Sequence, residues 1–185
     1  MEHPVDSRGL VLPEPSWPDR PGSAGPLEPL RRWCNTTNRE NGADAWRSAT
    51  ELAAWLAAEG QRAAGRVTAA DLTRLVAVRE ALWHGITSGD FDRFAATVGE
   101  LTVRLADTAL VPAGRGADAV VAELALAVAA AGASGELTRL KSCGHCRWVF
   151  YDTSKNRAGR WCSMAACGGR DKARQYRRRR AEALR

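Results

Sequence analysis

The sequence predicts a mainly α-helical protein, with a helical N-terminal domain at residues 27–138 and a small cysteine-rich module at residues 139–185. Three observations lead to this prediction. Apolar residues recur at helical spacing through the first segment, four of the five cysteines lie between Cys143 and Cys167, and positive charge gathers after them. At 185 residues, the chain has room for one modest core and a small appended module.

The helices are predicted from apolar side chains that recur three and four residues apart. Thr68 is the expected N-cap of the clearest helix, and glycines are expected to end the helices. The expected helices are a first over Leu27–Cys34, a second from Ala45 to Leu56 stopped by Gly60, a third from Thr68 to the glycines Gly85 and Gly89, a fourth through Phe91, Phe94 and Val98, and a fifth over Ala117–Ala131, central in the core.

One short β-hairpin is expected within the helical domain. Leu101, Val103 and Leu105 alternate with polar residues, as in one arm of a hairpin, and the turn-forming run Pro112–Gly116 follows. The apolar stripes of the helices are interpreted as core rather than as a cofactor site. His3, Cys34 and His84 are isolated from one another in sequence, and we interpret them as packed or exposed residues rather than ligands.

The first 26 residues and the overall composition bear on location. Residues 1–26 hold six of the eight prolines and are expected to form a disordered leader. They have neither the basic start nor the apolar run of a secretory signal, which favours a cytoplasmic, nucleoid-associated protein. The most apolar stretch, Ala117–Gly132, contains Asp118 and Glu123, so we expect a soluble helix and no membrane contact.

Charge is divided unequally along the chain. Residues 139–185 carry fourteen Lys or Arg against three acids, a net charge of +11. Because the whole chain has a net charge of +6, residues 1–138 carry −5. An acidic body with a basic end points to a polyanionic partner for the basic end.

The four clustered cysteines have the spacing of a metal site. Cys143, Cys146, Cys162 and Cys167 form a C-x2-C-x15-C-x4-C pattern. A turn with two intervening residues can present two sulfurs to one ion, and a second pair completes a tetrahedron. We therefore predict one structural Zn²⁺ held by these four residues, in a treble-clef-like module. With few bulky residues available, the module needs the binding energy of the metal in order to fold.

Three other interpretations of the cysteines stay open at this point. A redox Cys-x-x-Cys motif usually begins a helix and needs no second pair. A catalytic zinc keeps one position free for water, which four thiolates do not leave. Sulfur ligation is also compatible with an iron–sulfur cluster. Within the body, the sequence contains no phosphate loop, nucleophile elbow or paired-carboxylate pattern, and we expect no enzyme.

The module is expected to form a small ribbon followed by a basic helix. Val149 and its neighbours suit a short strand that returns through the turn at residues 154–157. The glycines at 168 and 169 are expected to release the chain from the metal site, with Asp171 near the start of the new helix. The predicted nucleic-acid contacts are Lys155, Asn156, Arg157, Arg160, Arg170, Lys172, Arg174, Arg177 and Arg178.

The module resembles a known zinc finger. The residues that carry the resemblance are Cys143-x2-Cys146, Phe150-Tyr-Asp152-x-Ser154-x-Asn156, Arg160-Trp-Cys162-Ser-Met164 and Cys167-Gly-Gly-Arg170-x-Lys172-x-Arg174. Over residues 137 to 180 they are similar to the CGNR zinc finger, which ends bacterial proteins whose N-terminal region is called the ABATE domain. The body is similar only at Asn35-Thr36, at Ala54-Trp55-Leu56 and in length. Gly169 stands where the family has Asn.

The resemblance implies a stress-related transcriptional regulator whose finger binds DNA. Under this hypothesis the zinc module positions the arginine-rich helix on DNA, and the helical domain forms a homodimer or senses a small-molecule effector. An RNA- or ribosome-binding protein is the first alternative, because Trp148, Tyr151 and Trp161 offer rings for base stacking. The second alternative is a ligand-binding body that the finger only localises.

Overall fold

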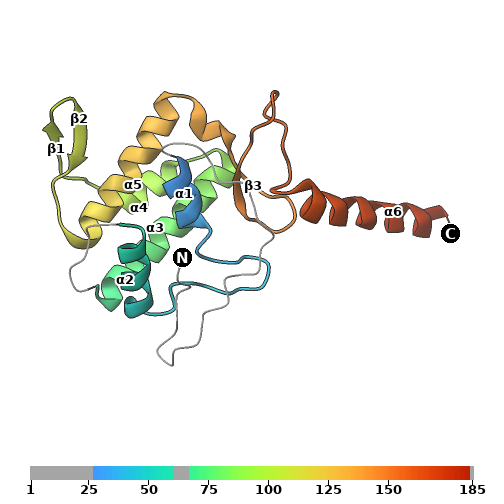
Figure 1. Ribbon diagram of the computed structural model, residues 1–185, viewed down its shortest axis with the longest axis horizontal. Helices are drawn as coiled ribbons and strands as arrows, with labels where there is room; N and C mark the ends of the chain where they lie inside the picture. The colour runs from blue at the N-terminus through green and yellow to red at the C-terminus, as the bar shows by residue number, and fades with distance from the viewer. Residues whose placement is uncertain (1–26, 61–66, 184–185) are drawn as a thin grey trace.

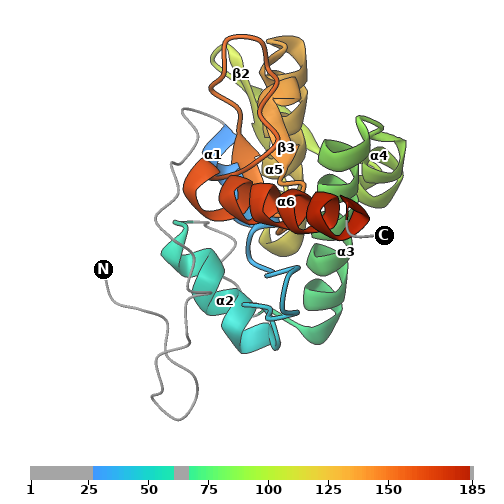
Figure 2. The same ribbon diagram turned by 90° about the vertical axis from the view of Figure 1, so that its right-hand side faces the viewer.

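A computed structural model of the chain describes residues 27–60 and 67–183. Helices pack together in a body, and a basic helix projects from one end of it (Figure 1). A turned view shows the same body with this helix in front (Figure 2). The predicted leader, residues 1–26, lies outside the described residues, as does His3.

Among the described residues, five helices form the body, close to the predicted positions. They are α1 (Leu27–Cys34), α2 (Ala49–Ala58), α3 (Ala69–Ser88), α4 (Asp92–Val98) and α5 (Gly116–Ala133). The prediction that the second helix starts at Ala45 is wrong. Ser48 caps α2 by accepting a hydrogen bond from the Glu51 amide, so the helix starts at Ala49 and the buried Trp46 lies in the preceding loop.

Both ends of α3 are set by local chemistry. Thr68 and Asp71 form the reciprocal hydrogen bonds of a capping box, which confirms Thr68 as the N-cap. Gly89 adopts a left-handed conformation and ends the helix. The prediction that Gly85 also marks the end of this helix is wrong. Gly85 is a buried position inside α3 where an added Cβ would lie 2.7 Å from the Phe91 ring, so the glycine lets Phe91 pack against the helix.

The predicted β-hairpin is present, with its turn elsewhere. Strands β1 (Val103–Ala106) and β2 (Ala109–Pro112) pair antiparallel, with Ala106 opposite Ala109. The turn is made by Asp107, whose positive φ of 52° is tolerated by Asp, and by the next residue. The run at 112–116 therefore leads from β2 into α5 rather than forming the hairpin turn.

The body core lies between α1, α3 and α5. Leu30, Leu75, Leu82 and Val121 are completely buried there. By length and composition α5 could cross a membrane, but it turns Val120, Val121, Leu124 and Val128 into this core. Its other side, which includes Ala129, is exposed, so the prediction that this helix is central in the core holds for one face of α5 only.

A buried ion pair ties the loop after α1 to α3. Arg79 of α3 is 2% exposed and donates to Asp44 at 2.8 and 2.5 Å and to the Thr36 hydroxyl at 3.1 Å. Its guanidinium also lies 4.9 Å from the centre of the Trp46 ring. The charge of Arg79 is therefore paired within the core.

The C-terminal part begins as a ribbon that joins the body. After a 3₁₀ turn, η1 (Glu136–Arg139), strands β3 (Leu140–Ser142) and β4 (Val149–Tyr151) pair antiparallel. The predicted strand is confirmed, but its partner precedes it and is not the chain returning from the turn at 154–157. Leu140 and Val149 belong to the body core, whereas the four cysteines form a separate buried cluster. The boundary at residue 138 stays a prediction.

Candidate metal centre and nucleic-acid interface

The first cysteine pair is held by the connection between β3 and β4. Within this connection the Arg147 amide donates to the Cys143 carbonyl at 3.0 Å, and the Cys143 amide donates to the Trp148 carbonyl at 2.8 Å. Arg147 has a positive φ of 64°, which closes the turn. This tight turn brings the sulfurs of Cys143 and Cys146 to one side. Its place between two antiparallel strands differs from the helix start that the redox interpretation requires.

The second pair is held by a π-helical turn, η2 (Met164–Gly168). Ser163 caps this turn, because its hydroxyl accepts from the Ala166 amide at 3.2 Å. Its carbonyl accepts from the amides of Cys167 at 2.9 Å and Gly168 at 3.0 Å. The wider turn directs the Cys167 sulfur back toward Cys162. Wide π-type turns recur at functional sites.

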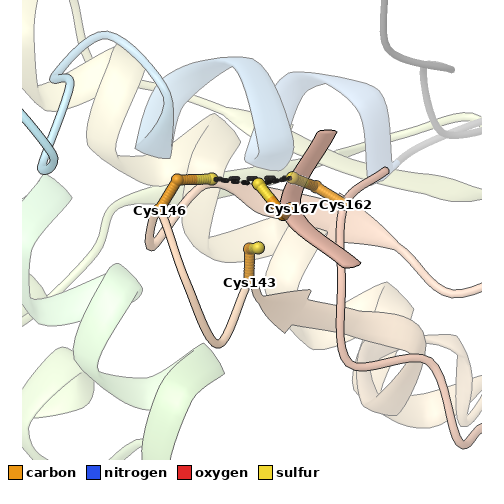
Figure 3. A group of neighbouring side chains, drawn as sticks. All are labelled: Cys143, Cys146, Cys162 and Cys167. Carbon is orange, nitrogen blue, oxygen red and sulfur yellow. Dashed lines mark hydrogen bonds between the residues drawn. The ribbon is translucent and has the colours of Figure 1, made fainter. Parts of the chain in front are cut away.

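The four sulfurs surround one point (Figure 3). All four lie within 4.8 Å of one another. Cys146 and Cys162 are 3.5 Å apart, and the Cys167 sulfur is 3.6 Å from each of them. A tetrahedron with Zn–S bonds of about 2.3 Å has sulfurs about 3.8 Å apart. These separations fit one Zn²⁺, and none of the five cysteines is in a disulfide.

The thiols are electrostatically coupled. Hydrogen bonds from the Cys146 and Cys162 thiols lower the pKa of Cys143 far below its usual range. Hydrogen bonding to Cys143 and Cys146 raises the pKa of Cys162, and burial raises that of Cys167 to about 11. Without a metal, the protein therefore favours a thiolate at Cys143 and thiols at Cys162 and Cys167. A divalent cation supplies the charge that lets the other sulfurs deprotonate and bind it.

Aromatic side chains shield the centre from water. The four cysteine residues are 0–7% exposed, and Phe150, Trp148 and Trp161 pack against them. The Trp161 ring comes within 3.0 Å of the position of a Cβ added at Gly144, in the turn between Cys143 and Cys146. With four sulfurs and a closed apolar shell, the site is a structural centre without an open position for substrate.

Asp152 fixes the loop between the two cysteine pairs. This carboxylate is 2% exposed, accepts from the Lys141 ammonium at 2.7 Å, and accepts from the amides of Ser154 at 3.0 Å and Gly159 at 2.8 Å. Burial by itself raises the pKa of Asp152, but these donors outweigh it and hold the pKa well below its usual range. The loop thereby returns to the first turn, where the Gly144 amide donates to the Arg160 carbonyl at 3.0 Å.

Comparison with known families agrees with this geometry. Residues 139–180 match the family model described as the CGNR zinc finger. The C-terminal module is a CGNR zinc finger. Together with the four convergent sulfurs, the match assigns one structural Zn²⁺ to Cys143, Cys146, Cys162 and Cys167. No curated protein sequence matches the chain.

The CGNR motif itself departs from one prediction. Its two glycines do not release the chain, because η2 continues directly into α6 (Gly169–Ala183). Gly168 is buried, and an added Cβ there would lie 2.9 Å from the Met164 sulfur. Gly169 has helical angles and open space, since its added Cβ would meet nothing closer than 3.7 Å. The glycines thus allow close packing, and the family Asn would fit at position 169.

The predicted nucleic-acid contacts of the finger fall into two groups. Those on the loop after β4 are partly engaged with the protein: Arg157 donates to the Thr138 hydroxyl at 2.6 Å, and Arg160 lies 5.1 Å from the centre of the Trp161 ring. Lys155 and Asn156 are exposed at the loop tip. The second group, on α6, is exposed and consists of Arg170, Lys172, Arg174, Arg177 and Arg178. The structure therefore separates the candidates into a loop and a helix.

Two of the α6 arginines near the metal have acidic partners. Arg170 of the CGNR motif donates to Glu40 of the body at 3.1 Å, and the His145 ring lies 3.8 Å from the same carboxylate. Arg174 donates to the buried Asp171 at 2.6 Å, as does Gln175 at 2.6 Å. Asp171 was predicted near the start of this helix, and it also ties the second turn of α6 to the first.

Sequence reasoning missed the residue that joins finger and body. The Asn35 side chain donates to the Val149 carbonyl and accepts from the Val149 amide, both at 2.8 Å. Trp83 of α3 adds a hydrogen bond to the Arg147 carbonyl at 3.2 Å. In the sequence, Asn35 belongs to the polar run that follows the first helix. Its sequence holds no signal for a contact 114 residues away.

A cleft of about 740 Å³ lies where body and finger meet. Its walls are the C-terminal ends of α3 and α5, strand β3, and the Cys143–Arg147 turn. Ile86, Phe91 and Leu137 make one side apolar, and Lys141 and Arg160 bring positive charge to the other. Its size is that of a small-molecule site.

Proposed function

We propose that this protein is a zinc-dependent DNA-binding protein that regulates transcription, in which the CGNR zinc finger positions α6 on DNA. One observation supports this above all others: α6 is a long cationic helix that leaves the body directly from the metal centre (Figure 1). From Lys172 to the last described residue, every side chain is exposed. Over its length α6 carries seven cations and only two acids.

Packing against the rest of the protein does not account for the exposed length of α6 from Lys172 onward. Its side chains bury no apolar face, and its arginines repel one another at i, i+3 and i+4 spacing. The negative charge of phosphate oxygens would remove that repulsion. One arginine can donate two parallel hydrogen bonds to a single phosphate. The metal centre supports this use because it fixes the first turn of α6, so that less ordering entropy is lost when the helix binds.

The body would then act on the finger. The resemblance of the chain to stress-related regulators favours a sensing or dimerising role for residues 27–138. Asn35, Trp83 and Glu40 give the body direct contacts with the finger through which a change in the body can reach α6. A homodimer formed by the body would place two copies of α6 on neighbouring sites.

Ligand binding by the body is a second candidate function, favoured by the cleft between α3, α5 and the finger. A ligand there would touch the turn that carries Cys143. Thermal-shift measurements with metabolite mixtures would test it, using Phe91→Ala to alter the cleft wall. A stabilising ligand whose effect survives in that variant would contradict binding in this cleft.

The experiment for the main proposal compares nucleic acids. Fluorescence anisotropy with the zinc-loaded chain would measure affinity for a mixed-sequence DNA duplex, for the RNA duplex of the same sequence, and for single-stranded RNA. We expect tightest binding to DNA, with affinity falling steeply as salt rises. Preference for either RNA would contradict the proposal and favour the alternative of an RNA- or ribosome-binding protein.

A further inference from the structure

The positive charge of α6 is spread too widely for one line of phosphates. At about 100° per residue, the seven cations cover roughly 260° of the helix circumference. They are Arg170, Lys172, Arg174, Arg177, Arg178, Arg179 and Arg180. A helix that lies on a surface needs an interacting stripe a little over about 100° wide. Phosphate groups can therefore contact α6 on several sides of the helix.

The rest of the circumference has the opposite character. A strip roughly 100° wide holds Asp171, Gln175 and Glu182 and no cation. Asp171 is turned inward and accepts hydrogen bonds from Arg174 and Gln175. Glu182 lies 3.4 Å from Arg178, at the edge of the strip. This side of α6 is the one that a polyanion would leave uncovered.

We propose that α6 enters the major groove of B-form DNA and contacts the phosphates of both strands, an inference that rests on the DNA-binding function proposed above. The groove is about 12 Å wide, and a helix with its side chains is about 10–12 Å across. Phosphates then line both flanks of the helix and base edges lie beneath it. The strip of Asp171, Gln175 and Glu182 faces out of the groove.

The helical positions assign a side to each cation. Lys172 and Arg179 project toward one strand, and Arg174 and Arg178 toward the other. Arg177 and Arg180 lie between these pairs, above the floor of the groove. Ala173, also on this central face, lets the helix backbone approach the bases closely. Arginines in the central position can bond guanine O6 and N7 and so carry sequence preference.

The surroundings of α6 leave this approach open. Every side chain from Lys172 to Ala183 is exposed, and Figure 1 shows the helix extending away from the body. Its 15 residues span about 22 Å. The minor groove, about 6 Å wide, does not admit a helix, and the major groove of A-form RNA is deep and narrow. The shape of α6 therefore favours B-form DNA.

Groove-specific probes test the inference. A mixed-sequence duplex with one A·T tract would be compared with the same duplex carrying glucosylated 5-hydroxymethylcytosine, which fills the major groove, and with the duplex bound by netropsin, which fills the minor groove. We expect the glucosylated duplex to bind about tenfold or more weakly and netropsin to change affinity by less than about twofold. The reverse pattern, or equal effects, would overturn the major-groove inference while DNA binding stands. Failure to bind any duplex would overturn the proposed function as well.

Two neighbouring arginines test the contact with both strands. Arg178 and Arg179 are adjacent in sequence but lie on opposite edges of the strip that holds Asp171, Gln175 and Glu182. Arg178→Ala and Arg179→Ala should each lower affinity by about three- to tenfold and reduce the slope of log K against log salt by about one. Gln175→Ala, within the strip, should leave affinity unchanged within about twofold. If either arginine variant binds like the wild type, α6 docks by one face and the inference is wrong.

Discussion

Asn35 and Val149 form two hydrogen bonds of 2.8 Å, so that an asparagine side chain stands where a neighbouring strand would pair with β4. The pair joins the end of α1 to the ribbon of the zinc finger. Val149 is buried in the body core on one side and is adjacent in sequence to Phe150, which packs on the cysteine cluster. Asn35 therefore links the body directly to the strand that supports the metal centre.

Asn35→Ala should lower the free energy of unfolding of the zinc-loaded protein by about 2–3 kcal/mol, because it leaves both polar groups of a buried backbone unit without partners. Urea denaturation with zinc present would measure the change. Asn41 is the matched control, since its side chain makes only an exposed hydrogen bond to the Ala43 amide, and Asn41→Ala should cost less than about 1 kcal/mol. Equal losses in the free energy of unfolding for the two variants would show that the Asn35–Val149 contact stabilises the protein no more than an exposed hydrogen bond does.

Two glycines of the finger should respond in opposite ways to alanine. At Gly159 an added Cβ would lie 2.6 Å from a carboxylate oxygen of the buried Asp152, so Gly159→Ala should destabilise the finger by about 1–3 kcal/mol and weaken zinc binding. At Gly169 the space is open and the angles are helical, so alanine there should be neutral or stabilise by up to about 1 kcal/mol. Chelator competition would rank zinc affinities, and weaker zinc binding in the Gly169 variant than in the Gly159 variant would refute this account.

Glu40 should restrain the arginine of the CGNR motif. Its carboxylate pairs with Arg170 at 3.1 Å in an exposed position, where an ion pair is weak. Glu40→Gln should therefore raise DNA affinity only about two- to fivefold at low salt, and the gain should disappear at about 0.5 M salt. Anisotropy titrations at the two salt concentrations measure both effects. A gain that persists at high salt would mean that Glu40 acts through the fold rather than through its charge.

The helical content of α6 should rise when DNA binds. Isolated helices of this length are marginal in water, and the adjacent arginines of α6 oppose helix formation until phosphates neutralise them. Circular dichroism at 222 nm should show more helix in the complex than in the sum of its components. A chain that ends at residue 174 is the control and should show no increase. The same gain in both proteins would place the ordering in the body.

The features that could be predicted from the sequence are those set by neighbours along the chain. Thr68 with Asp71 indicates where a helix starts, and Gly89 indicates where it ends. The cysteine spacing predicts the metal centre. Ala45 and Trp46 misled because they fit the helical period, whereas Ser48 sets the boundary through a side-chain hydrogen bond. The pairing of β3 with β4 was missed because three-residue strands carry almost no pattern.

Contacts between distant segments could not be predicted in the same way. The partners of Asn35, Glu40 and Arg79 lie 35 to 130 residues away along the chain. Their residue types fit many exposed loops and helices equally well. The sequence also could not show that η2 continues into α6, because two glycines normally end a helix rather than join two.

The most direct measurement is DNA affinity as a function of bound zinc. The freshly purified, reduced protein should contain one zinc per chain, lose DNA affinity by about a hundredfold or more when a chelator removes it, and recover on addition of one equivalent. Cys162→Ser, which removes one of the four ligands, should remain weak with or without added zinc. Full DNA affinity in metal-free protein, or in the Cys162→Ser variant, would contradict the claim that the metal centre holds α6 for binding.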